Sequence, residues 1–143
     1  MQTQCNESRM EFHGLGERVL TAGFDGGNIV SDGGVPLLAE VKSEWDPPDR
    51  MFLAEIARLA AGYEGPLALM SFDPGVMAVL KDLAPAVPRG IVSGSYFEDD
   101  GEGWWPGSSL TDERRRSLAR LEESAAVDPA FYAYEIAALP TPE

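Results

Sequence analysis

The stretch VPLLAEVKSEWDPP, residues 35–48, sets an apolar run beside two charged residues of opposite sign. VPLLAEV is almost continuously apolar, which is typical of a strand that is buried on both faces of a parallel sheet. Side chains alternate across a strand, so Leu38, Glu40 and Lys42 should share one face. The residues between them should face the opposite way.

A strand followed by a helix then recurs along the chain. Further strands are expected in PLALMS (66–71), RGIVSG (89–94) and AFYAYEI (130–136). Helices are expected after Asp46-Pro47, after Asp73-Pro74 and after Thr111, because Asp and Thr cap helix starts and Pro suits the first turn. Gly62 is the expected stop of the first helix.

This alternation predicts an α/β fold with parallel strands and crossover connections. The strand and helix pattern amounts to about three βα units plus one strand, roughly half of a TIM (β/α) barrel. An open sheet covered by helices is the alternative. Half a barrel would expose two sheet edges, so self-association through these edges is also expected.

Residues 1–34 have a different pattern, so the sequence divides into an N-terminal segment 1–34 and a domain 35–143. Asp-Gly-Gly occurs at residues 25–27 and 32–34. Such turns favour a small hairpin of Val19–Phe24 with Asn28–Ser31.

Composition excludes several classes of protein. The formal net charge of −13 argues against binding to nucleic-acid backbone or to an anionic membrane surface. One cysteine cannot build a disulfide framework. The sequence shows no apolar run typical of a signal peptide or a membrane span, so a cytoplasmic protein is expected.

Glu40 and Lys42 are the main candidates for chemistry, because α/β folds bind ligands at the carboxyl ends of parallel strands. Glu40 suits a hard cation such as Mg²⁺ or Ca²⁺, and Lys42 suits a phosphoryl group. An ordinary ion pair at the strand end is the alternative.

Three other features have a structural and a functional interpretation. Trp104 and Trp105 either cover an edge of the core or stack on a sugar or lipid head group. The acidic residues between 98 and 102 are interpreted as solvated, with Ca²⁺ binding as the alternative. The run DERRRSLARLEES (112–124) is interpreted as a solvated helix face.

Residues 35–143 resemble the middle of a glycerophosphodiester phosphodiesterase. The pieces that carry the resemblance are VPLLAEVKSEW, the segment from FLAEI to IVSG, GWWPG and FYAYEIAALPTP. The resemblance implies a TIM barrel and hydrolysis of a glycerophosphodiester with a divalent cation. By the same resemblance, Glu40 is a metal ligand, Lys42 contacts phosphate, and Ser71 and Phe72 line the pocket.

The chain departs from this family where catalysis occurs. The family uses two histidines and further metal carboxylates that precede the equivalent of Glu40. Here the only histidine is His13, in FHGLG, which is not the family's motif. A phosphodiesterase-like fragment without activity of its own is therefore expected.

Residues 1–41 resemble the start of a transposase with a DDE catalytic domain, through EFHGLG, FDGGNIVSDGG and LLAEV. Asp25 and Asp32 are interpreted as turn residues and not as catalytic carboxylates. A truncated transposase and a small acidic α/β binding protein are the alternative interpretations of the chain.

Overall fold

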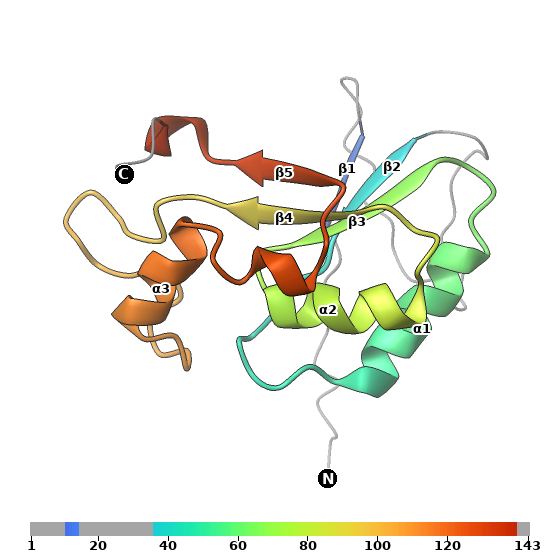
Figure 1. Ribbon diagram of the computed structural model, residues 1–143, viewed down its shortest axis with the longest axis horizontal. Coiled ribbons are helices and arrows are strands. Elements are labelled where there is room, and N and C mark those ends of the chain that lie inside the picture. Colours follow the sequence, from blue (N-terminus) through green and yellow to red (C-terminus); the bar gives the residue numbers. More distant parts are fainter. Residues whose placement is uncertain (1–10, 15–35, 140–143) are drawn as a thin grey trace, which may run out of the picture.

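A computed structural model describes residues 11–14 and 36–139 (Figure 1). The strands are β1 (Glu11–Gly14), β2 (Leu37–Glu40), β3 (Leu67–Ser71), β4 (Arg89–Ser93) and β5 (Phe131–Tyr134). The α-helices are α1 (Arg50–Ala61), α2 (Pro74–Leu83) and α3 (Asp112–Ala119), and two short 3₁₀ turns are η1 (Ser124–Ala126) and η2 (Ile136–Ala138). The hairpin predicted for Val19–Phe24 and Asn28–Ser31 lies outside the described residues.

The strands form one sheet in the order β1-β2-β3-β4-β5. Strands β2 to β5 are parallel, which confirms the α/β prediction of a parallel sheet with helical crossovers. Strand β1 was not predicted. It pairs antiparallel with β2, with Glu11 opposite Glu40, so residues of the N-terminal segment and of the domain share one sheet.

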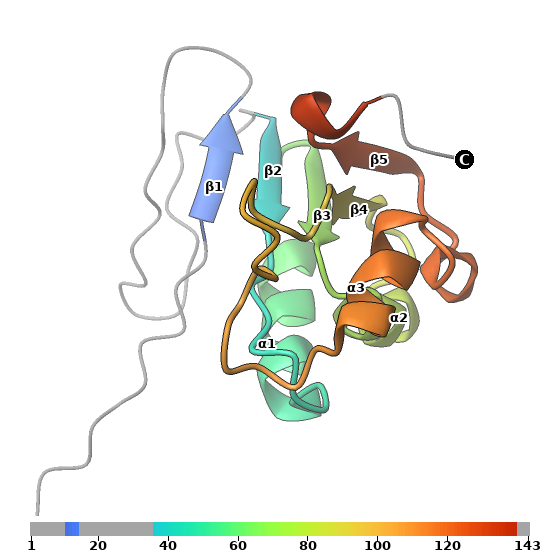
Figure 2. The same ribbon diagram turned by 90° about the vertical axis from the view of Figure 1, so that its left-hand side faces the viewer.

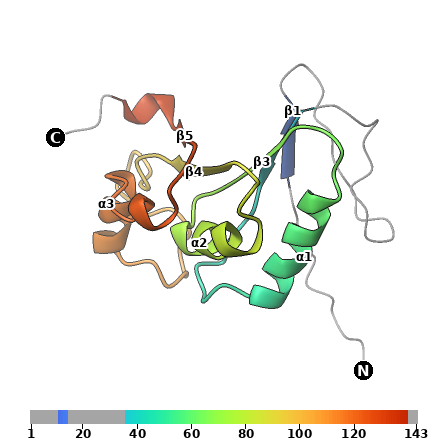
Figure 3. The ribbon, with the colours of Figure 1, turned by 45° about the vertical axis from the view of Figure 1, so that its right-hand side comes forward.

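All three α-helices lie on the same face of the sheet, as Figures 2 and 3 show from two further directions. Because each strand pairs with the next one along the chain, the crossovers wind in one sense and place their helices together. The other face carries none of the described helices.

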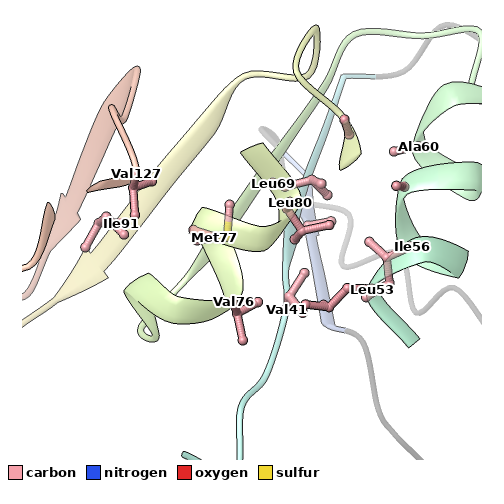
Figure 4. Close-up of a cluster of buried hydrophobic side chains, with 13 residues drawn as sticks. Val41, Leu53, Ile56, Ala60, Leu69, Val76, Met77, Leu80, Ile91 and Val127 are labelled. Carbon is pink, nitrogen blue, oxygen red and sulfur yellow. The ribbon is translucent and has the colours of Figure 1, made fainter. Parts of the chain in front are cut away.

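The main core fills the space between the sheet, α1 and α2 (Figure 4). The strands contribute Ala39, Leu69 and Ile91, and the helices contribute Ile56 and Leu80 among others. Because Ala39 faces this core, the alternation of side chains places Leu38 and Glu40 together on the helix-free face. The sequence predicted that they share a face, but not which face.

The start of α1 was predicted wrongly. Asp46 was the expected cap, but Asp49 caps the helix, and its carboxylate accepts hydrogen bonds from the N–H groups of Met51 and Phe52 at 2.9 and 3.2 Å. The sequence reads Asp46-Pro47-Pro48, and a residue that precedes proline is disfavoured in helical conformation. Pro48 therefore disfavours a helical Pro47, and the helix starts only after Pro48.

The other helix boundaries follow the prediction. Asp73 caps α2 with Pro74 in its first turn, and Thr111 caps α3. Gly62 ends α1, although its φ of −86° lies in the ordinary helical range and not in the left-handed region.

Candidate functional site

Glu40 and Lys42 form an ion pair at the carboxyl end of β2. The Lys42 ammonium donates a hydrogen bond of 2.9 Å to Oε1 of Glu40. The side chain of Glu40 is only 8% exposed, whereas that of Lys42 is 49% exposed. A buried carboxylate is therefore compensated by a cation that still reaches solvent, at the strand end where the sequence placed it.

Two serines fix the backbone that carries this pair. The Ser71 hydroxyl donates to the carbonyl of Val41 at 2.7 Å and accepts from the N–H of Asp73 at 3.1 Å. The Ser43 hydroxyl donates to Oδ2 of Asp73 at 2.5 Å and accepts from the N–H of Trp45 at 2.9 Å. These bonds tie the segment after β2 to the start of α2, so Lys42 lies on an anchored backbone.

The two residues predicted to line a pocket have different surroundings. Ser71 is 1% exposed and its hydroxyl is engaged by backbone groups. Phe72 lies among aromatic rings that gather next to the carboxyl ends of β3 and β4. We call these rings the aromatic cluster, which consists of Trp45, Phe72, Tyr96, Trp104 and Trp105.

The rings of the aromatic cluster pack mostly edge to face. Phe72 lies 6.0 Å from Tyr96 and 5.2 Å from Trp105 between ring centroids, and Trp45 lies 5.2 Å from Trp105. Such pairs contribute roughly 0.5–1.5 kcal/mol beyond the burial of their area. Trp104 and Trp105 thus cover a core edge, which is the structural interpretation of the sequence.

Three members of the cluster have a left-handed backbone. Trp45, Tyr96 and Trp105 have φ values of 65°, 60° and 55°. This conformation is unusual for bulky residues and costs about 1–3 kcal/mol at each position. Packing within the cluster must offset that cost, which makes the carboxyl end of the sheet a region of stored strain.

Arg115 holds the loop that carries both tryptophans, and the sequence did not indicate it. Its guanidinium donates to the carbonyl of Trp104 at 3.0 and 2.9 Å and to Asp112 at 2.9 Å. Arg115 is only 7% exposed, so the solvated face predicted for residues 112–124 is wrong at this position. The mixed charges of residues 112–124 do not indicate that one arginine binds backbone carbonyl groups of the preceding loop.

Glu135 is a second residue that sequence reasoning missed. It directly follows β5, and its Oε2 accepts a hydrogen bond from the N–H of Ser95 at 3.1 Å. A β-carbon on Gly94 would lie 2.8 Å from Oε2 of Glu135 and 2.9 Å from the Trp104 ring. Gly94 therefore permits a carboxylate and an indole to meet at the same end of the sheet as Glu40.

The donor set described at this end does not by itself fit a hard divalent cation. Within residues 36–139, no three carboxylate, histidine or cysteine side chains gather as a metal-binding group. Glu40 supplies one carboxylate, and Lys42 already binds one of its oxygens. Hard cations require several oxygen ligands. The acidic residues between 98 and 102 likewise form no such group.

Comparisons of the chain with protein-family models, with curated proteins and with solved structures found no match. Among the described residues, no helix combines the length and the apolar character that crossing a membrane requires.

With no matching protein, the candidate site is defined by its geometry: a buried Glu40 and an accessible Lys42, held on an anchored backbone at the carboxyl end of a parallel sheet.

Proposed function

We propose that residues 35–143 are a phosphodiesterase-like fragment that binds the phosphate of a glycerophosphodiester. The observation that carries the proposal is the ion pair of Glu40 and Lys42, 2.9 Å apart, at the carboxyl end of β2. The half-exposed ammonium of Lys42 is available to a phosphoryl oxygen, whose negative charge it would neutralise.

The winding of the chain supports a partial TIM barrel as the parent architecture. Four parallel strands follow one another in sequence order, with all described α-helices on one face. In such a barrel the helix-free face is the interior, and ligands bind at the carboxyl ends of the strands. Glu40 and Lys42 occupy that position.

Binding without turnover is the expected activity of this chain. The resembled family uses two histidines as general acid and general base, and this chain has one. The described residues also do not complete a cation site. Glu40 would contribute a single ligand to the divalent cation that the resemblance implies.

Thermal unfolding tests the proposal, because a ligand that binds the native state raises the midpoint. Glycerol 3-phosphate should raise the midpoint of the wild-type chain, and Lys42→Met should abolish that shift while Lys81→Met retains it.

Two results would contradict the proposal. The first is a phosphate-dependent shift of equal size in both lysine variants, which would indicate unspecific screening of charge. The second is the absence of any shift with glycerol 3-phosphate in a chain that unfolds cooperatively.

A small acidic binding protein is the second candidate function. It is favoured by a surface hollow between β4 and α3 that is lined by carboxylates and aromatic rings. The truncated transposase has no such support, because the segment that resembles it lies mostly outside the described residues.

A further inference from the structure

The loop between β4 and α3 borders an open surface hollow of about 350 Å³. We call it the acidic hollow, and its lining consists of Glu98, Glu102, Gly103, Trp104, Trp105 and Pro106. It thus combines two carboxylates with two indole rings. The phosphodiesterase resemblance assigns no ligand to this hollow.

The two indoles form a corner. Their ring centroids are 5.7 Å apart and their planes meet at 81°. Both rings are anchored, because they pack in the aromatic cluster and because Arg115 binds the carbonyl of Trp104. Two perpendicular aromatic walls surround a compact group better than they support a flat ring, and their π faces attract positive charge.

The loop that carries the carboxylates is also fixed. Phe97 and Gly103 form an isolated antiparallel bridge, and the N–H of Glu98 donates to the carbonyl of Glu102 at 2.8 Å. The N–H of Gly101 closes a turn onto the carbonyl of Glu98 at 2.9 Å. A ligand therefore meets a loop that is already ordered, which reduces the entropic cost of binding.

The side chains of the lining favour a cation. Glu98 and Glu102 are exposed, and neither has an ion-pair partner among the residues that the structure describes. Apart from the indole N–H groups, the lining side chains offer no hydrogen-bond donor, which an anionic ligand would need from its site. The protein already places one of its own cations on a neighbouring ring, since the guanidinium of Arg116 lies 5.4 Å from the centroid of Phe97.

We propose that the acidic hollow binds a small organic cation of the alkylammonium class, with the quaternary ammonium group as its best occupant. The indole faces contact the methyl groups that carry the positive charge, and the two carboxylates supply the opposite charge at the rim. A quaternary ammonium has no N–H group that needs a hydrogen-bond partner, which suits the indole faces, and it interacts with the carboxylates through charge alone.

The test uses the full chain, tetramethylammonium as the probe, and tert-butanol as a neutral molecule of similar shape. Binding is followed by the indole N–H signals in NMR spectra and by tryptophan fluorescence. We expect saturable binding of tetramethylammonium, with tert-butanol at least about tenfold weaker because it lacks the charge. The double variant Glu98→Gln/Glu102→Gln should weaken binding of the cation at least about fivefold.

The matched control is Asp99→Asn/Glu113→Gln, which removes the same net charge from exposed residues that do not line the hollow. It should bind like the wild type, and circular dichroism verifies that both variants fold. Equal weakening in both variants would overturn the proposal, since it would show an effect of net charge alone. Equal affinity for tert-butanol, saturable binding of glucose in place of the cation, or no saturation with tetramethylammonium would overturn it as well.

Discussion

Tyr96 combines complete burial with a left-handed backbone at the centre of the aromatic cluster. Its pKa is raised above the ordinary value of 10.0, chiefly because burial disfavours the phenolate. Below pH 10 the phenol keeps its proton in both the folded and the unfolded chain, and its contribution to stability is complete. Above pH 10 the unfolded chain ionises first, so the free energy of unfolding should fall as pH rises.

The measurable consequence is a decline of up to about 1.4 kcal/mol per pH unit above pH 10 in urea unfolding experiments. Tyr96→Phe should flatten most of this decline, and a smaller slope should remain from Tyr134, whose pKa is raised by partial burial. Tyr132→Phe is the control, because this ring is 49% exposed. An unchanged slope in Tyr96→Phe would contradict the assignment.

At the residue scale, the sequence predicted which side chains share a face of a strand, because this depends only on local periodicity. The alternation along residues 35–41 predicted that Leu38 and Glu40 share a face, and the pairing of Glu40 with Lys42 was one of the two interpretations considered. Arg115 and Glu135 were missed because their partners are backbone groups of irregular loops, outside any periodic pattern. Only the tertiary fold brings such groups together.

Helix α2 depends on Asp73 more than helix α1 depends on Asp49, although both residues are N-caps. Asp49 is exposed, and its carboxylate accepts hydrogen bonds from two N–H groups at the start of α1. Asp73 is 3% exposed, accepts from the N–H of Gly75 at 2.8 Å, and also accepts the Ser43 hydroxyl. Asp49→Ala should therefore cost about 1 kcal/mol of unfolding free energy, and Asp73→Ala about 2–4 kcal/mol.

Chemical denaturation of the two variants measures this difference. Asp73→Asn, which retains an oxygen for the cap, should recover at least half of the loss. Equal costs for Asp49→Ala and Asp73→Ala would show that the bond to Ser43 contributes nothing to stability.

At the element scale, helix starts with a single capping residue were predictable. The start of α1 was not, because a capping residue and two consecutive prolines favour different boundaries. Asp73-Pro74 and Thr111 start helices as expected. Asp46 does not, because the second proline in Asp46-Pro47-Pro48 opposes a helical Pro47. Strand β1 was also missed, since the four residues Glu11–Gly14 are too short to show a period and gain their pairing only from the edge of β2.

At the scale of the whole molecule, the parallel pairing and the number of βα units were predictable, because strands and helices alternate strictly. Whether the sheet continues into a barrel was not, since closure depends on strands beyond those described. Within the described residues, β5 pairs with β4 alone, so its outer edge is open. Open edges of this kind pair with other chains.

Apolar side chains accompany this open edge. Tyr132, Ile136 and Leu139 are 49%, 86% and 53% exposed, and they lie in β5 or directly after it. We therefore predict that the chain self-associates through β5. The net charge of −13 opposes association between copies. Salt screens this repulsion, so a dimer formed through β5 should become more stable as the salt concentration rises.

Sedimentation velocity at increasing protein and salt concentration measures this association. Ile136→Lys should shift the chain toward the monomer by placing a charge at the edge. Met51→Lys is the matched control: Met51 is also 86% exposed, but it lies in α1, on the helical face of the sheet. A monomer at every salt concentration would contradict the prediction, and equal loss of the dimer in both variants would place the contact elsewhere than β5.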